Sequence, residues 1–402
     1  MVTRRDFLAQ SAALVSLAPF APPLLRQASA AAAEVSGERV LVVIQLSGGN
    51  DGLNTVIPFK DAEYRKNRFT LAIPAEQQRK INDELAFHPS LGGFAKLLEA
   101  GKLAIVQGVG YPQPNRSHFE SMDLWHTAHQ LNGSRPAGWL GKYLDGQFAA
   151  DGRDVPALHL GGEKQPLALA GEKAAATSVQ SLERFRVEPN DAAFVAEIRR
   201  ATTAARDGGN ELLSFIQSSA SAALAASGRV ERSLGKYKTD IVYPGTGLAQ
   251  KLRMIAQLID AGLSTRIYYV TLDGFDTHAN QAAAHAGLLS EVGDATRAFV
   301  EDLDAHGHGK RVAVLTFSEF GRRVRENASA GTDHGAAAPL FVAGGGIRSG
   351  VIGKHPSLTD LDDGDLKQHT DYRRVYAALL ENWLRVKSAP ILGGDYEPLP
   401  LI

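Results

Sequence analysis

Stretches of continuous apolar residues alternate with amphipathic stretches along most of the chain. The first continuous run covers residues 40–46, and a similar run covers residues 103–109. Continuous apolarity is typical of a strand buried on both faces, as in a parallel sheet between two helix layers. The same reasoning predicts strands at residues 265–272, 311–317 and 340–343.

Helical spacing of apolar positions separates these predicted strands. It predicts helices at residues 91–100, 117–129, 248–261, 288–305 and 372–384. Regular alternation of strands and helices indicates an α/β fold with a doubly wound, mostly parallel sheet and helices on both faces. We therefore expect one such domain over most of the chain.

Residues 190–235 have a different character. They are rich in Ala, Ser, Arg and Glu at helical spacing and carry few groups suited to chemistry. We interpret them as a helical insertion within a single domain that covers residues 34–402. The last residues, 390–402, are expected to run in an extended conformation.

The first 33 residues resemble an export signal. Arg4 and Arg5 precede Phe7 and Leu8, an apolar stretch at 12–25 is interrupted by prolines, and Ala-Ser-Ala follows. Paired arginines before such a stretch are typical of twin-arginine signals, and the stretch is too short for a spanning helix. The sequence predicts a mature protein without a stable membrane anchor, exported by the twin-arginine machinery to the periplasm or beyond.

Composition limits the chemistry. The 402 residues include 43 basic and 44 acidic side chains, 12 histidines and no cysteine. A formal charge of −1 gives no global electrostatic support for nucleic-acid binding. The absence of cysteine excludes thiolate-held metal sites and disulfides.

Groups that can bind metals follow the predicted strands. In an open parallel sheet, ligands bind beyond the carboxyl ends of the strands. Carboxylates and imidazoles without thiolates suit divalent ions such as zinc or manganese. The candidates, in chain order, are Asp51, His118, Asp273, Asp276, His278, Glu319, Asp333, His334 and His369.

Each candidate also has an ordinary structural explanation. Asp51 lies in a Gly-rich turn, where it could cap backbone amides. Ser117 has the spacing of a helix N-cap, and His369 could cap a helix. His88, at the entry to a predicted helix, is a further possible site residue that could also serve as a cap. What favours a metal site is that so many candidates lie at predicted strand ends in one chain. The remaining histidines lack such placement and are interpreted as structural: His126, His129, His159, His285, His306, His308 and His355.

The order of these residues resembles that of the alkaline phosphatase and sulfatase superfamily. Within it, the chain is identified as a member of the export-signal family named domain of unknown function 1501. The motifs that carry this resemblance are residues 45–54, 114–119, 273–281, 318–322 and 332–335. Together they extend over nearly the whole mature chain, and they imply an alkaline-phosphatase-like sheet.

The resemblance implies one or two divalent ions, with zinc favoured and manganese or calcium as alternatives. One metal would be held by Asp51, Asp333 and His334. The other would be held by His278, His369 and an aspartate, and the spacing leaves both Asp273 and Asp276 open. Glu319 is a further ligand candidate because it directly follows a predicted strand.

The resemblance also implies a nucleophile. Ser117 Oγ would attack a phosphorus or sulfur centre, and Arg116 would add a fixed positive charge. His118 has no counterpart in the phosphatases of the superfamily, and a general acid, a ligand and a core residue remain open. Substrate binding is assigned to three residues: Asn50, Asn54 and Arg322.

The sequence therefore predicts an exported, metal-dependent hydrolase of small phosphate or sulfate esters. A phosphomutase-like transferase could use the same nucleophile. The alternative from another class is a non-catalytic exported binding or assembly protein that retains the fold.

Overall fold

Strand β1 (Val40–Leu46) lies inside the main sheet, and all seven of its residues are buried. It pairs in parallel with β8 (Ile267–Leu272) on one side and with β9 (Val312–Ser318) on the other. Ile44 lies opposite Val270 and Thr316 in this register. Burial on both faces explains why six of these seven residues are apolar, with Gln45 as the exception.

The computed structural model describes residues 38–129, 137–147, 155–174, 176–180 and 237–402. The predicted signal at 1–33 and the predicted insertion at 190–235 lie outside these residues. Residues 39–402 group into one compact unit.

The described residues form a nine-stranded main sheet with the order β11-β5-β10-β9-β1-β8-β6-β7, and β14 also pairs with β5. Strand β10 is antiparallel to both of its neighbours, and the other pairs are parallel. The predicted mostly parallel sheet is thus confirmed. The bounds are β5 (Leu103–Gly110), β6 (Ala157–Leu160), β7 (Ala176–Val179), β10 (Ala338–Ala343), β11 (Gly350–Ile352) and β14 (Thr370–Asp371).

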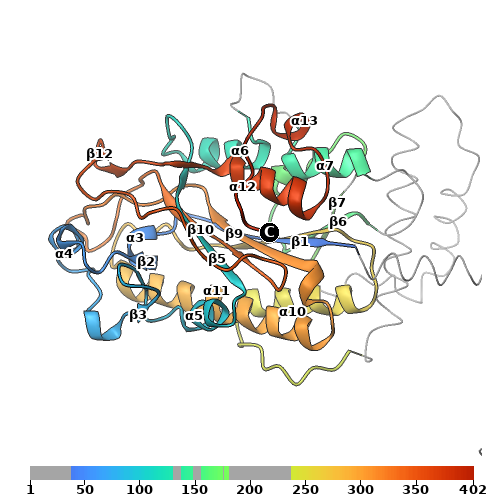
Figure 1. Cartoon of the computed structure of the whole chain (residues 1–402), viewed down its shortest axis with the longest axis horizontal. Helices are drawn as coiled ribbons and strands as arrows, with labels where there is room; N and C mark the ends of the chain where they lie inside the picture. Colours follow the sequence, from blue (N-terminus) through green and yellow to red (C-terminus); the bar gives the residue numbers. More distant parts are fainter. Residues whose placement is uncertain (1–37, 130–136, 148–154, 175, 181–236) are drawn as a thin grey trace, which may run out of the picture. The chain divides into compact units, whose positions relative to one another are not determined.

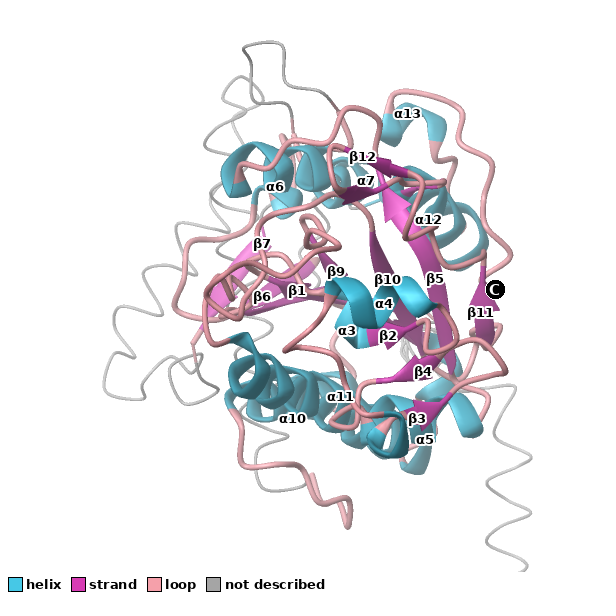
Figure 2. Ribbon diagram, turned by 90° about the vertical axis from the view of Figure 1, so that its left-hand side faces the viewer, coloured by secondary structure: helices cyan, strands magenta, loops and turns pink. Residues whose placement is uncertain are grey.

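Helices cover both faces of the sheet, as Figures 1 and 2 show. Alternate residues of β1 divide between two apolar cores, with Val42 in one and Val43 in the other. The first core also contains α5 (Gly92–Glu99), α10 (Gly247–Asp260) and α11 (Gln281–Ala305). The second contains α6 (His118–Thr127), α7 (Trp139–Gln147), α12 (Tyr372–Ala378), the π-helical turn η6 (Leu379–Trp383) and α13 (Ala389–Leu392).

Short elements flank this framework. The remaining strands form a small antiparallel sheet, β2-β4-β3, and a two-stranded sheet, β12-β13. Their bounds are β2 (Val56–Ile57), β3 (Arg79–Lys80), β4 (Ala86–Phe87), β12 (Leu361–Asp362) and β13 (Asp365–Leu366). The short helices are α3 (Gly52–Thr55), α4 (Ala62–Asn67), η2 (Ala75–Gln77), η3 (Leu167–Leu169) and η5 (Gly309–Arg311).

Helix α11 begins at Gln281, seven residues before the predicted start at 288. Its first turns carry buried polar side chains, because Gln281 contacts Asp51 and His285 contacts Asn50. An apolar pattern cannot reveal a helix segment whose buried face is polar.

Four strands end at one edge of the sheet. Strands β5 and β9 are both antiparallel to β10, so they run parallel to each other and to β1 and β8. The segments that follow these four strands carry all of the predicted site residues except His369, which lies between β13 and β14. Among the helices of the described ranges, none combines the length and apolarity needed to cross a membrane.

Candidate metal centre

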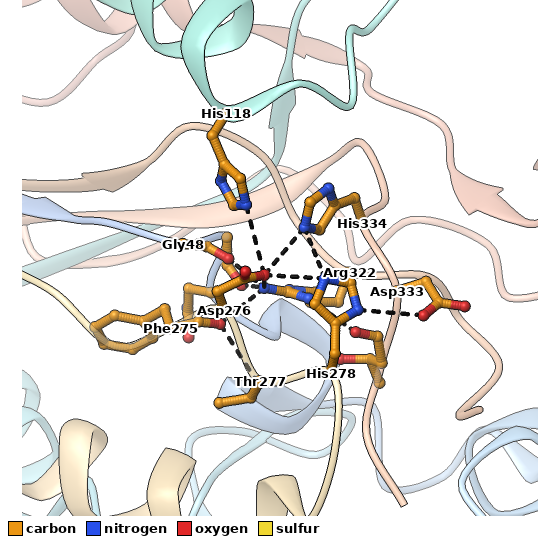
Figure 3. A network of polar contacts seen from close by, with 12 residues as sticks. Gly48, His118, Phe275, Asp276, Thr277, His278, Arg322, Asp333 and His334 are labelled. Atoms are coloured by element: carbon orange, nitrogen blue, oxygen red, sulfur yellow. Dashed lines mark hydrogen bonds and ion pairs between the residues drawn. The ribbon is translucent and has the colours of Figure 1, made fainter. Parts of the chain in front are cut away.

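Three side chains from distant parts of the chain meet at this edge of the sheet. His118 opens α6, Asp276 follows β8, and His334 lies in the loop between β9 and β10. One ligand atom from each lies within 4.8 Å of the others. We call His118, Asp276 and His334 the central triad. Figure 3 shows all three directed toward one point.

Asp276 Oδ1 is the common contact of the triad. It lies 3.0 Å from His334 Nε2 and 3.5 Å from His118 Nε2. Arg322 donates to the same oxygen at 2.8 Å. Partial burial favours a higher pKa, but the contacts with His334 and Arg322 outweigh it and lower the pKa of Asp276 to about 2. Asp276 is therefore a carboxylate at neutral pH.

The ring of His334 is oriented by a backbone carbonyl. Its Nδ1 lies 2.8 Å from the carbonyl oxygen of Arg116. Because a carbonyl only accepts, Nδ1 carries the hydrogen, and the neutral ring has a lone pair at Nε2. That lone pair faces the carboxylate of Asp276 at 3.0 Å. Two acceptors this close need a proton or a cation between them, so the geometry fits a bound metal ion.

His118 has an equivalent orienting contact. Its Nδ1 lies 2.9 Å from Glu319 Oε1, and its Nε2 faces Asp276. The hydrogen bond to Glu319 raises the pKa of His118, against the opposing effect of burial. Glu319 is 1% exposed and also accepts from the backbone N–H of Gly48 at 2.8 Å.

His278 and Asp333 lie at the margin of the triad (Figure 3). His278 Nε2 is 3.0 Å from Asp276 Oδ1 and 2.9 Å from His334 Nε2. On its other side, His278 Nδ1 is 3.3 Å from Asp333 Oδ1. A hydrogen bond from Asn327 is the main reason that the pKa of Asp333 is lowered. His278 is thus placed to be a fourth ligand, with Asp333 behind it.

Arg322 holds the surrounding loops together. It is 1% exposed, and its guanidinium donates to the carbonyls of Gly48, Gly49, Phe275 and Thr332 as well as to Asp276. These partners follow β1, β8 and β9. The guanidinium therefore links the loops that surround the site.

Gly48 allows the loops after β1 and β8 to approach closely. Its φ of +117° favours glycine, and a Cβ there would lie 2.3 Å from the backbone nitrogen of Asp276. Such a contact is sterically forbidden. The Gly-rich motif after the first strand is thus needed to bring Asp276 to the site.

Asp51 lies apart from the triad. It is fully buried and forms a two-point ion pair with Arg68, and it also accepts from Gln281. Burial alone would raise the pKa of Asp51, but the charge and hydrogen bonds of Arg68 lower it to about 2. The structure thus gives the predicted ligand Asp51 a guanidinium as its partner. The sequence has no motif that marks Arg68, which is a single arginine after α4.

His369 and Asp273 are also not joined to the triad. His369 Nε2 contacts the carbonyl oxygen of Lys354 at 2.8 Å, and its Nδ1 contacts the Thr370 hydroxyl at 3.0 Å. Asp273 is exposed, and no hydrogen bond or ion pair within the described ranges links it to the cluster. Between Asp273 and Asp276, the structure brings only Asp276 to the histidines.

The two predicted substrate-binding asparagines are buried. Asn50 Oδ1 contacts His285 at 2.9 Å and accepts from Thr55 at 3.1 Å. Asn54 donates to the carbonyl of Leu71 at 2.8 Å and accepts from Tyr64 at 3.0 Å. Both amides therefore form hydrogen bonds in the interior of the protein. Burial lowers the pKa of His285 to about 4, so this ring is neutral at pH 7.

Ser117 and Arg116 precede the triad residue His118. Ser117 is the N-cap residue of α6, yet its hydroxyl makes no capping hydrogen bond. The Arg116 side chain turns away to Asp365 at 2.7 Å and Asp363 at 3.0 Å. Its positive charge is thus already paired, whereas its carbonyl orients His334.

The chain belongs to the family described as "Protein of unknown function (DUF1501)", which it matches over residues 38–380. This confirms the family inferred from the motifs. A search of curated proteins found no match.

Solved structures with a similar arrangement include PsFucS1 sulfatase from Pseudoalteromonas sp., with 13% identity and a TM-score of 0.38 over 93% of this chain and 72% of that chain. They also include a protein of the alkaline phosphatase superfamily from Vibrio parahaemolyticus (8% identity, 89% and 69% covered, TM-score 0.38). A third is the phosphonate monoester hydrolase of Agrobacterium radiobacter (9% identity, 90% and 78% covered, TM-score 0.35).

Proposed function

We propose that the protein is a metal-dependent hydrolase of small phosphate or sulfate esters, with one divalent ion at the central triad. The observation that carries this proposal is the orientation of His334. Its Nδ1 is bound to a carbonyl, so its Nε2 lone pair faces the carboxylate of Asp276. Two imidazoles and a carboxylate favour zinc or manganese, whereas calcium prefers a shell of oxygen ligands.

The ligand residues would be His118, Asp276 and His334, with His278 as the fourth. A bound divalent ion would supply Lewis-acid activation of an ester oxygen and stabilise a nearby alkoxide. Asp276 contributes the negative charge of the site because its carboxylate stays ionised at neutral pH. Arg322 keeps that carboxylate in place by donating a hydrogen bond to it.

Ser117 is the proposed nucleophile. It directly precedes the ligand His118, and its hydroxyl makes no cap hydrogen bond that attack would have to break. The ester group would lie at the start of α6, where free backbone N–H groups and the helix dipole favour anionic oxygens. The Ser117 oxygen would form a bond to phosphorus or sulfur as the alcohol leaves, and water would then release the anion.

The decisive experiment measures bound metal and turnover on the same preparations. Protein purified from periplasm is analysed for zinc, manganese and calcium. It is then assayed with aryl phosphates, a phosphodiester and aryl sulfates in the presence of each metal. We expect Asp276→Asn to lose metal and turnover, and Ser117→Ala to lose turnover but keep metal.

Asp273→Asn is the matched control, because Asp273 lies on the same loop but is exposed and unconnected to the cluster. It should retain both properties. If wild type and Asp276→Asn carry equally negligible metal after reconstitution, the enzyme proposal fails.

A second candidate is an exported binding or assembly protein without turnover. The pairing of Arg322 with Asp276 favours it, because this cation already compensates the carboxylate in the absence of a metal. Metal binding without hydrolysis across the whole substrate panel would support this candidate. Turnover that Ser117→Ala abolishes would exclude it.

Export by the twin-arginine pathway is part of both proposals and rests on Arg4 and Arg5. Replacing both with lysine should leave the full-length precursor in the cytoplasm, as detected by fractionation. Normal export of this variant would exclude the twin-arginine route.

A further inference from the structure

Glu319 connects α6 to the sheet through three separate contacts. Its carboxylate contacts His118 at 2.9 Å. Its backbone carbonyl accepts from the Ser121 hydroxyl at 2.6 Å and from the Trp125 indole at 2.8 Å. Residues spaced three and four apart lie on one face of a helix. One face of α6 is thus docked on one residue at the end of β9.

The carboxylate of Glu319 is itself held firmly. Oε1 accepts from the backbone N–H of Gly48 at 2.8 Å, and Oε2 lies 3.1 Å from the Ser318 hydroxyl. The residue is 1% exposed. With both oxygens engaged and the side chain buried, Glu319 faces His118 rather than the centre of the triad.

Two carboxylates compete for the one hydrogen of a neutral His118 ring. Glu319 lies 2.9 Å from Nδ1, and Asp276 lies 3.5 Å from Nε2. The shorter contact places the hydrogen on Nδ1, which leaves a lone pair on Nε2 toward Asp276. If the hydrogen moved to Nε2, it would bond to Asp276 and occupy the position from which the ring binds a metal.

We propose that Glu319 is a positioning residue that holds His118 in the Nδ1–H tautomer and so keeps Nε2 available as a metal ligand. This inference rests on the proposed metal centre. It differs from the assignment of Glu319 as a ligand, because Glu319 acts here through His118. Outer carboxylates that bind a ligand histidine change metal affinity by about 10- to 100-fold.

The test compares Glu319→Gln with Glu326→Gln. Glu326 is the matched control, a second buried glutamate of the same loop that accepts backbone N–H groups from Thr70 and Leu71. A neutral amide at 319 is a weaker acceptor than the Asp276 carboxylate, so the hydrogen should shift toward Nε2.

The first readout is nitrogen NMR of the metal-free protein at a pH where the ring is neutral. His118 should carry its hydrogen on Nδ1 in wild type and in Glu326→Gln, with an Nε2–H population appearing in Glu319→Gln. An Nε2–H tautomer in wild type would overturn the inference. Wild type alone decides this point, even if Glu319→Gln fails to fold.

The second readout is zinc affinity by chelator competition, in wild type and in His118→Ala. Glu319→Gln should weaken binding by about 10- to 100-fold in the wild-type background and by less than about twofold in His118→Ala. Equal losses in both backgrounds would show that Glu319 does not act through His118. Absence of zinc binding in wild type would instead refute the proposed function, while the NMR result would still decide the tautomer.

Discussion

Asp51 and Arg68 form a fully buried ion pair in which two guanidinium nitrogens face the two carboxylate oxygens. Both side chains are inaccessible to solvent. A charge left alone in such a place has lost its hydration without compensation. Each partner of the pair therefore compensates the buried charge of the other.

We predict that Asp51→Ala destabilises the fold by about 3–5 kcal/mol, because Arg68 is left buried and unpaired. Urea denaturation at pH 7 measures this change. The double variant Asp51→Ala/Arg68→Met should be more stable than Asp51→Ala alone. A loss below about 1 kcal/mol would contradict the buried-pair interpretation.

His334 and His369 should behave differently in metal binding. His334 faces Asp276, whereas His369 contacts Lys354 and Thr370. We expect His334→Ala to weaken zinc binding by more than about 100-fold, beyond the loss typical of outer contacts. His369→Ala should change it by less than about threefold. If chelator competition showed equal losses of zinc affinity in the two variants, His369 would have to be a ligand as well.

Arg322→Lys should loosen the frame of the site. An ammonium cannot reproduce the planar set of donors that reaches four carbonyls and Asp276. The unsatisfied buried carbonyls should reduce the free energy of unfolding by about 2–4 kcal/mol. Arg323→Lys is the control, because Arg323 is partly exposed and pairs with Asp363 at the surface. Thermal and urea unfolding of both variants measure the difference.

His126 should make stability depend on pH. Burial lowers its pKa to about 3, while the unfolded value is 6.5. The unfolded chain binds this proton first, so the stability that the neutral ring contributes is complete above pH 6.5 and is lost as the pH falls toward 3. From this group alone, the free energy of unfolding should be about 2–3 kcal/mol lower at pH 4.5 than at pH 7.5.

Urea unfolding of wild type and His126→Gln at the two pH values tests this expectation. His126→Gln should reduce the loss between pH 7.5 and pH 4.5. His369→Gln, which changes an exposed ring, should leave the loss unchanged. If His126→Gln showed the same pH dependence as wild type, His126 would not be the cause of the loss of stability at low pH.

Much of the fold followed from apolar patterns, because strands covered on both faces must be apolar throughout. The direction of β10 did not follow from the sequence. Its residues Leu340 and Phe341 are apolar for a strand of either direction. The first turns of α11 were missed because the prediction relied on apolar residues. The buried side chains there, Gln281 and His285, are polar and form hydrogen bonds.

The location of the site followed from strand ends, whereas the membership of the triad did not. Asp51 and Asp276 both lie in loops after parallel strands. Their positions in the sequence therefore cannot show which of the two lies at the triad. What separates them is Arg68, which approaches Asp51 from a segment without any recognisable motif. Likewise, only the three-dimensional structure places the Arg116 carbonyl against His334.

The three residues of the central triad come from widely separated stretches of the chain. A chain shorter than 334 residues would lack at least one of the three donors. Retention of a metal ion at the proposed centre would accordingly report that the segments after β5, β8 and β9 have come together. Under the proposed twin-arginine export, which carries folded proteins, the ion would be bound before the protein crosses the membrane.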